Sequence, residues 1–164
     1  MSARENESGL VLAALVVIAA ITMLPETLTY HVSRMVGRPL EPSHRIMRDE
    51  VARAAEAYDI EPEVLEALVE VESAYRRTAE SKVGARGLSQ VMPFNAQRCG
   101  LHRDQLWDAV ANLRCGALIL REELDRVGNL RDALTVYNCG KINCREGKKY
   151  ALKVEKLIAN KFRL

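Results

Sequence analysis

The 164-residue sequence contains no long run of charge of one sign. Its 24 Lys and Arg residues are mixed with 22 Asp and Glu residues, so the formal net charge is only +2. Proteins that bind nucleic acid usually gather basic residues on one face or along one helix. The distribution seen here is typical of a solvated surface, and it argues against nucleic acid as a partner.

The sequence also lacks the usual signatures of metal and cofactor sites. Its three histidines, His31, His44 and His102, are isolated and fit no metal-ligand spacing. There is no glycine-rich phosphate-binding loop, and the serines have no evident His and Asp partners for nucleophilic catalysis. We therefore expect no metal, no nucleotide and no organic cofactor.

Charge is absent from Ser8 to Pro25, where Gly9 to Leu24 read GLVLAALVVIAAITML. As a helix, about 18 residues span roughly 27 Å, close to the ~30 Å hydrocarbon core of a membrane. Three interpretations stay open: an uncleaved transmembrane anchor, a cleaved signal peptide and a buried core helix. The residues before the segment are not predominantly basic and no clear cleavage site follows it, which favours the anchor.

The apolar segment divides the chain into three predicted parts. Residues 1–26 form the transmembrane anchor or signal segment, and residues 27–42 form a linker with several turn-forming residues. Residues 43–164 form the folded domain. Under both membrane interpretations this domain is exported from the cytoplasm.

All four cysteines lie in the predicted domain. An even number of cysteines in an exported domain favours disulfides. Neighbours in the sequence close the shortest loops, so we expect the pairs Cys99–Cys115 and Cys139–Cys144. A zinc site built from all four thiolates is the alternative, and no C-x-x-C pair supports it.

Residues 43–164 show the hydrophobic periodicity of helices, and no segment of any length alternates as a strand does. We expect an all-α domain that follows an N-terminal hydrophobic helix. A loop at 76–93 is rich in glycine and polar residues. Prolines, glycines and capping residues mark the helix ends. Helices are expected at about 43–60, 62–73, 93–99, 109–127 and 129–137, with a last helix that carries Tyr150.

The helix expected at 62–73 places one glutamate on its apolar side. Leu65, Leu68 and Val69 form that side at 100° per residue. Glu72 falls in the same sector, whereas the other glutamates of the helix face the opposite way. Two interpretations of Glu72 are open: a buried acid paired with Arg or backbone donors, and an acid that lines a cleft. In a cleft, desolvation and the negative end of the helix dipole raise its pKa, which makes it a proton donor near neutral pH.

Glu72 has no evident partner carboxylate. Glycoside hydrolysis usually needs two carboxyl groups beside the bond that breaks. Glu70 points away from Glu72 on the helical wheel. Nothing in the sequence directs Glu80, Asp108 or Glu146 toward it. The missing partner argues against ordinary inverting chemistry, which needs a base to activate water.

Several short segments occur in the order and spacing of one known family. They are Glu72-Ser73, the stretch GARGLSQVMP at 84–93, Asn112 with Gly116, Ala133-Leu134, Tyr137-Asn138-Cys139-Gly140, and Tyr150. Together they resemble the catalytic domain of soluble lytic transglycosylases, a lysozyme-like fold, over about residues 45 to 160. The ordered set is specific, although each motif alone is modest.

Three positions depart from the family pattern. Ser89 stands where the family often has Met, and Asn95 stands where it often has Thr. These changes affect the fit of the substrate rather than the reaction. Cys139 replaces a small residue of the Tyr-Asn-x-Gly motif, and its pairing with Cys144 would staple the loop beside the site.

The resemblance implies cleavage of the β-1,4 bond between N-acetylmuramic acid and N-acetylglucosamine without water, which leaves a 1,6-anhydromuramyl end. Glu72 then acts first as an acid and afterwards as a base, in agreement with the missing second carboxylate. Tyr137 and Tyr150 also fit helical stripes, so core packing is the alternative for both. The resemblance assigns substrate contacts to Ser73, Ser89, Gln90, Tyr137, Asn138 and Tyr150.

The resemblance further implies an exported enzyme that opens the cell wall locally. Short members of the family serve secretion systems, conjugation machines and phage particles. We expect peptidoglycan as the substrate, and a location at the periplasmic face of the inner membrane, in the periplasm or in a virion. Two alternatives are a hydrolytic muramidase on the same fold and a non-catalytic module that binds peptidoglycan or serves assembly.

Overall fold

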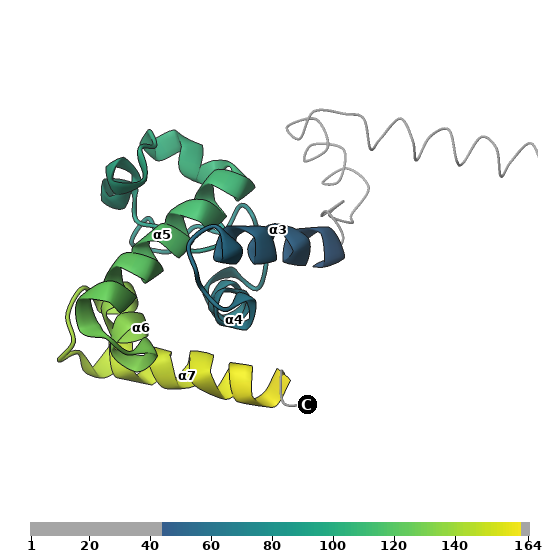
Figure 1. The fold of residues 1–164 in the computed structure, drawn as a ribbon. Helices are drawn as coiled ribbons and strands as arrows, with labels where there is room; N and C mark the ends of the chain where they lie inside the picture. The colour runs from purple at the N-terminus through teal and green to yellow at the C-terminus, as the bar shows by residue number, and fades with distance from the viewer. Residues whose placement is uncertain (1–43, 162–164) are drawn as a thin grey trace, which may run out of the picture. The chain divides into compact units, whose positions relative to one another are not determined.

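The computed structural model describes residues 44–161, and these residues are predominantly helical (Figure 1). In this part of the chain the only β-structure consists of isolated antiparallel bridges, Glu80 to Arg86 and Arg86 to Val91. The prediction of an all-α domain is confirmed. The helices are α3 (His44–Glu56), α4 (Pro62–Ser73), η1 (Pro93–Cys99), η2 (Arg103–Trp107), α5 (Ala109–Val127), α6 (Leu130–Cys139) and α7 (Arg145–Lys161), where η marks a 3₁₀ helix.

The predicted N-terminal anchor or signal at 1–26 and the predicted linker at 27–42 lie outside the described residues. Between residues 44 and 161, none of the helices is long and apolar enough to cross a membrane.

The five α-helices between residues 44 and 161 form one continuous core. α7 packs against α6 and α4, and α5 packs against α6 and α3 (Figure 1). Leu65, Leu68 and Val69 of α4 are fully buried in this core, as the helical wheel predicted. A second, smaller cluster lies where η1 and η2 meet α5, around Leu106 and Ile119.

Local sequence explains most of the helix ends. Pro62 opens α4, where its fixed φ angle suits the first turn. Asp108 caps α5 by accepting a 2.8 Å hydrogen bond from the backbone N–H of Ala111. Asn129 caps α6 in the same way, with Asp132 as its donor. These caps and the bounds of α4 and α5 agree with the sequence prediction.

The first predicted helix extended too far. α3 ends at Glu56 rather than near Ile60, because Asp59 has a left-handed backbone with a φ of 51°. The backbone N–H groups of Tyr58 and Ile60 both turn back to the carbonyl oxygen of Ala55. The turn places Ile60 in the core at 6% exposure, so its apolar side chain continued the sequence pattern without continuing the helix.

Sequence reasoning also missed η2 and two residues of α6. His102 and Gln105 form a reciprocal cap at the start of η2, with a 2.8 Å bond from the His102 N–H to the Gln105 side chain. A histidine in that role was not anticipated. α6 continues past Tyr137 to Cys139, and Gly140 then ends it with a left-handed backbone.

Both predicted disulfides are present. Cys99 pairs with Cys115, which joins η1 to α5 across a Cα–Cα distance of 5.3 Å. Cys139 pairs with Cys144, which closes the short loop between α6 and α7. No cysteine of the described residues is free. The alternative of a zinc site built from four thiolates is therefore not the arrangement in this structure.

Candidate active site

Glu72 lies in the last turn of α4, at the edge of the apolar side of the helix. Its side chain is mostly buried. Burial raises the pKa of Glu72 from its ordinary value of 4.5 to about 7, because the desolvated carboxyl group favours its neutral form. This carboxyl group therefore exchanges a proton near neutral pH.

α7 brings two groups to this carboxyl. The Tyr150 hydroxyl faces Glu72 and lowers its pKa, and the positive charge of Lys153 does so to a smaller extent. Both effects favour the ionised carboxylate, but burial outweighs them. The Tyr150 hydroxyl is itself buried and makes no hydrogen bond of ordinary geometry with any described residue. It nevertheless lies close enough to Glu72 to favour the ionised carboxylate.

Tyr137 closes the site from α6. Its hydroxyl donates a 2.8 Å hydrogen bond to the carbonyl oxygen of Ser89. Burial and the nearby charge of Glu72 hold the pKa of Tyr137 well above its ordinary value. The pKa of Tyr150 is raised for the same two reasons, and Tyr137 adds to the effect. Glu72, Tyr137 and Tyr150 thus form one electrostatically connected group.

Gly116 of α5 allows this close packing. A Cβ atom at Gly116 would lie 2.4 Å from the Cβ of Ser89 and 3.1 Å from the Tyr137 hydroxyl. Both distances are shorter than side chains ordinarily tolerate. The absence of a side chain at Gly116 lets the 76–93 loop and α6 approach each other across α5.

Asn112 anchors that loop from the same helix. Its side-chain oxygen accepts a 2.8 Å hydrogen bond from the Ser89 N–H. Its side-chain nitrogen donates to the carbonyl oxygens of Arg86 and Leu106, at 2.8 and 2.9 Å. Asn112 is fully buried and all its hydrogen-bonding capacity is directed inward. It thereby sets the position of Ser89, to which Tyr137 is bonded.

The predicted substrate-contact residues fall into two groups. Tyr137 and Tyr150 lie beside Glu72, and Asn138 is exposed immediately after Tyr137. Ser73, Ser89 and Gln90 make internal contacts instead. The Ser73 hydroxyl donates to the Val69 carbonyl oxygen, inside α4.

The conformation of the 76–93 loop turns the side chains of Ser89 and Gln90 toward the protein interior. The Ser89 hydroxyl is fully buried and has no hydrogen-bond partner among the described residues. Gln90 has a left-handed backbone with a φ of 48°. Its side-chain nitrogen donates to the carbonyl oxygens of Ala79 and Gly87, at 3.0 and 2.9 Å. Only its side-chain oxygen is left to accept a hydrogen bond from a ligand.

α7 also holds α4 at a second place. The Lys161 ammonium group lies 3.0 Å from a Glu66 carboxyl oxygen and 2.6 Å from one of Glu70. Glu66 and Glu70 precede Glu72 on the same helix by six and two residues. Helix α7 therefore contacts the helix that carries Glu72 both through Lys161 and, near its other end, through Tyr150.

Sequence reasoning missed two contributors to this site. Lys153 influences Glu72, and its position three residues after Tyr150 on a predicted helix was a usable signal. Asn112 belongs to the motif set named from the sequence, but its anchoring role had no signal there. Its three partners lie in two other segments, the 76–93 loop and η2. Among the described residues, no group of three or more His, Cys, Asp or Glu side chains is arranged to hold a metal ion.

Comparison with known proteins gives a consistent result. The family model described as "Transglycosylase SLT domain" matches residues 49–160. A curated transglycosylase of Enterobacteria phage PRD1 is 34% identical over 99 residues, which cover 60% of this chain and 37% of the phage protein. The chain thus spans well under half the length of that relative.

Two solved structures share the fold. The 70-kDa soluble lytic transglycosylase of Escherichia coli matches with a TM-score of 0.62 and 24% identity, over 68% of this chain and 23% of that one. An inactive mutant of the lytic transglycosylase Slt of Pseudomonas aeruginosa matches with a TM-score of 0.59 and 23% identity, over 71% of this chain and 23% of that one. At these identities the likeness concerns the fold.

The described residues share the fold of these lytic transglycosylases, and in this chain a glutamate at the end of one helix faces tyrosines from two others. Since the family model covers more than half of the sequence, the chain belongs to the transglycosylase SLT family.

Proposed function

We propose that residues 43–164 form a peptidoglycan lytic transglycosylase domain. It cleaves the β-1,4 bond between N-acetylmuramic acid and N-acetylglucosamine and forms a 1,6-anhydromuramyl end. The observation that carries the proposal is the solitary state of Glu72. Its pKa of about 7 is set by burial, Tyr150 and Lys153, and among the described residues no second carboxyl group influences it. Membership of the transglycosylase SLT family supports the same reaction.

One carboxyl group is sufficient for this chemistry. Protonated Glu72 donates its proton to the glycosidic oxygen while the bond from that oxygen to C1 of the muramyl residue breaks. The substrate's acetamido group stabilises the positive charge at C1. The C6 hydroxyl then attacks C1 and gives its proton to the Glu72 carboxylate, which restores the starting state without water. A pKa near 7 suits both steps, because neither protonation state is strongly favoured at neutral pH.

The neighbouring residues take supporting roles in the proposal. Tyr150 stabilises the Glu72 carboxylate after the first proton transfer, because its hydroxyl favours the ionised form. Tyr137 and Asn138 form the wall beside the reacting sugar. Ser89 and Gln90 hold the 76–93 loop in place, and Ser73 keeps the last turn of α4 regular. Ser73, Ser89 and Gln90 can contact a sugar only through atoms that make no internal hydrogen bond, such as the Gln90 side-chain oxygen.

Product analysis tests the reaction. Purified peptidoglycan digested with the protein should yield fragments with anhydromuramyl ends, each lighter by one water than the reducing ends that a hydrolase leaves. Glu72→Gln should abolish them. Glu63→Gln on the same helix is the matched control and should retain activity. Reducing ends would support the muramidase alternative, and a lack of any product from the unmodified protein would support the non-catalytic module.

The cellular setting is a second part of the proposal. The apolar segment at 8–25 tethers or exports the domain, so that it acts on the wall from the periplasmic side or from a virion. The similarity to a transglycosylase of a phage supports local wall opening during phage entry or release. Fractionation of producing cells tests the anchor. The full chain should be found with the membrane, and a variant with charged residues within 8–25 should be found in the soluble fraction.

A further inference from the structure

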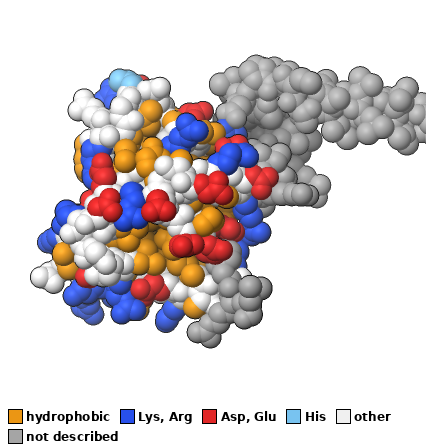
Figure 2. Space-filling view, viewed as in Figure 1, with side chains coloured by type: hydrophobic (Ala, Val, Ile, Leu, Met, Phe, Trp, Pro, Cys, Tyr) orange, Lys and Arg blue, Asp and Glu red, His pale blue; other side chains and the backbone are white. Residues whose placement is uncertain are grey.

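The outward side of α7 carries a stripe of basic residues. Arg145, Lys148, Lys149 and Lys156 are all exposed, and Leu152 lies among them with 44% of its surface accessible. At 100° per residue these five side chains share one side of the helix. The stripe is about 16 Å long at 1.5 Å per residue. We call these five residues the α7 outer face, and Figure 2 shows basic side chains along the lower edge of the molecule, over this helix.

The positive charge of the α7 outer face is only partly neutralised. Glu146 pairs with Lys149 at 3.0 Å, and Glu155 is drawn away toward Arg131 of α6 at 2.8 Å. Within residues 47–161, no acidic side chain lies within ion-pair distance of Arg145, Lys148 or Lys156. Three cationic groups on one side of one helix therefore remain available to an anionic partner, in a chain whose net charge is only +2.

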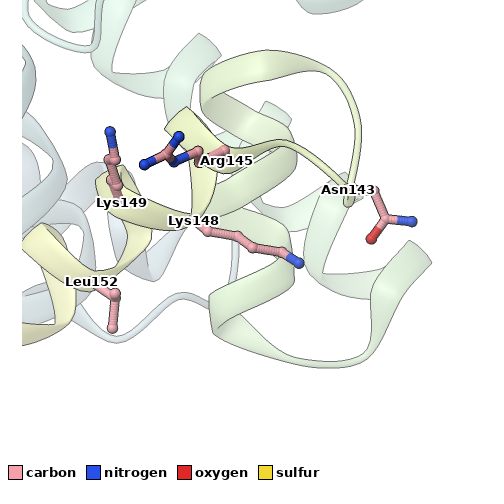
Figure 3. Close-up of a pocket in the computed structure, with 5 residues that line it drawn as sticks. All are labelled: Asn143, Arg145, Lys148, Lys149 and Leu152. Atoms are coloured by element: carbon pink, nitrogen blue, oxygen red, sulfur yellow. The ribbon is translucent and has the colours of Figure 1, made fainter.

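The basic residues border a shallow, open hollow of the surface. Its volume is about 500 Å³, and it is lined by Asn143, Arg145, Lys148, Lys149 and Leu152. Figure 3 shows Lys148 extended toward Asn143 of the loop before α7, whereas Arg145 is turned the other way, so the cationic ends are spread apart. Guanidinium, ammonium and amide groups are the donors that carboxylates accept hydrogen bonds from. The arrangement fits an anion with carboxyl groups that enters the hollow.

The α7 outer face is separate from the site around Glu72. Tyr150 and Val154 lie on the opposite side of α7, where Val154 is fully buried in the core and Tyr150 faces Glu72. A ligand on the outer face therefore does not touch the reacting bond. Because both sides belong to one helix, a ligand held there stays at a fixed distance from Tyr150.

We propose that the α7 outer face binds the free carboxylates of the peptide stems of peptidoglycan, while a glycan strand of the same polymer occupies the Glu72 site. This inference rests on the proposed function, since it takes peptidoglycan as the substrate. Two attachments to one polymer make the second an intramolecular event and raise the local concentration of strands. The domain would thereby remain on an insoluble substrate between cleavages.

An anionic lipid surface fits the α7 outer face less well. Membrane-binding helices combine their basic residues with a broad apolar side that enters the lipid. Here the apolar side of α7 is buried in the protein core, and Leu152 is the only large apolar residue of the outer face. Vesicle binding is therefore an outcome that the experiment must distinguish.

The test measures binding without cleavage. A Glu72→Gln protein and the same protein with Arg145→Gln, Lys148→Gln and Lys156→Gln are sedimented with purified peptidoglycan at low and physiological salt. The matched control carries Lys82→Gln, Arg103→Gln and Arg114→Gln, three exposed basic residues elsewhere on the domain. We expect binding to weaken about tenfold for the α7 variant and less than twofold for the control, with the difference larger at low salt.

Chemical amidation of the peptidoglycan carboxylates separates the partners. Amidated wall should bind the Glu72→Gln protein as weakly as untreated wall binds the α7 variant. The proposal is overturned if the α7 variant binds like the control, if amidation has no effect, or if vesicles of anionic phospholipid bind the outer face and peptidoglycan does not. Failure of the proposed reaction would appear separately, as the absence of anhydromuramyl products from the unmodified protein with binding intact.

Discussion

The hydroxyl of Tyr137 donates a 2.8 Å hydrogen bond to the carbonyl oxygen of Ser89, 48 positions earlier in the chain. This hydrogen bond joins the end of α6 to the 76–93 loop, beside Gly116 of α5. Tyr137 also lies close enough to Glu72 for the carboxylate charge to raise the pKa of the tyrosine. The geometry around Glu72 therefore depends on contacts between segments that are distant in sequence.

Replacing Glu72 by Gln should stabilise the fold at neutral pH. The unfolded carboxyl titrates near 4.5 and the folded one near 7, so the folded state binds more protons between these pH values. The free energy of unfolding of the parent should therefore fall as pH rises through this window, by at most about 3 kcal/mol. Chemical denaturation of parent and Glu72→Gln at pH 5 and pH 8 should show a difference that grows with pH. A difference that is constant between the two pH values would contradict this assignment.

The rate of cleavage should fall as pH rises through about 7, because Glu72 must begin the reaction protonated. Tyr150→Phe removes a hydroxyl that lowers the pKa of Glu72, so the alkaline limb should move to higher pH. The maximal rate should also fall about tenfold or more if the hydroxyl stabilises the carboxylate between the two steps. The measurement is the pH dependence of anhydromuramyl product formation for parent and variant. Tyr58→Phe, remote from Glu72 on the turn after α3, should change neither quantity.

Asn112→Asp should destabilise the protein by about 3 kcal/mol or more at neutral pH, because a buried carboxylate would face the carbonyl oxygens of Arg86 and Leu106. The loss should be smaller at low pH, where the new carboxyl group is neutral and can donate one hydrogen bond. Thermal unfolding at several pH values checks this expectation. Asn160→Asp is the control, since position 160 is exposed on α7 and its side chain makes no hydrogen bond among the described residues. Equal losses in both variants would show that Asn112 does not anchor the loop.

Gly116→Ala should destabilise the protein by about 1–3 kcal/mol, because the added Cβ would lie 2.4 Å from the Cβ of Ser89. The intrinsic preference of helices for Ala over Gly acts in the opposite direction, by up to about 1 kcal/mol. Removing the opposing Cβ with Ser89→Gly in the same protein should recover part of the loss. Denaturant unfolding of the single and double variants measures this coupling. Additive effects of the two substitutions would exclude a direct clash.

The sequence predicted those features that depend on local pattern. The apolar side of α4 and the placement of Glu72 at its edge follow from a 3.6-residue period within 12 residues. The caps at Asp108 and Asn129 are equally local. The end of α3 was misplaced because Ile60 continues the hydrophobic period while a turn at Asp59 reverses the chain.

The remaining features depend on the approach of distant segments. Nothing within the 76–93 stretch indicates that the Gln90 side chain turns inward to the Ala79 and Gly87 carbonyl oxygens, because this follows from its left-handed backbone. A raised pKa of Glu72 was expected under only one of its two interpretations, and the size of the effect depends on how deeply the packed helices bury the carboxyl group. Such quantities are set by packing and not by residue spacing.

The two contacts of α7 with α4 set a lower limit on the length of chain that can keep the surroundings of Glu72. Glu72 lies on α4, but Tyr150 and Lys153, which adjust its affinity for protons, both come from α7. The Lys161 ion pairs hold the rest of α4 from the same helix. A fragment that stopped before Arg145 would keep Glu72 and lose the residues of α7 that affect its pKa. Any transfer of the Glu72 site to another scaffold must therefore carry α4 and α7 together, although more than 70 residues separate Ser73 from Arg145.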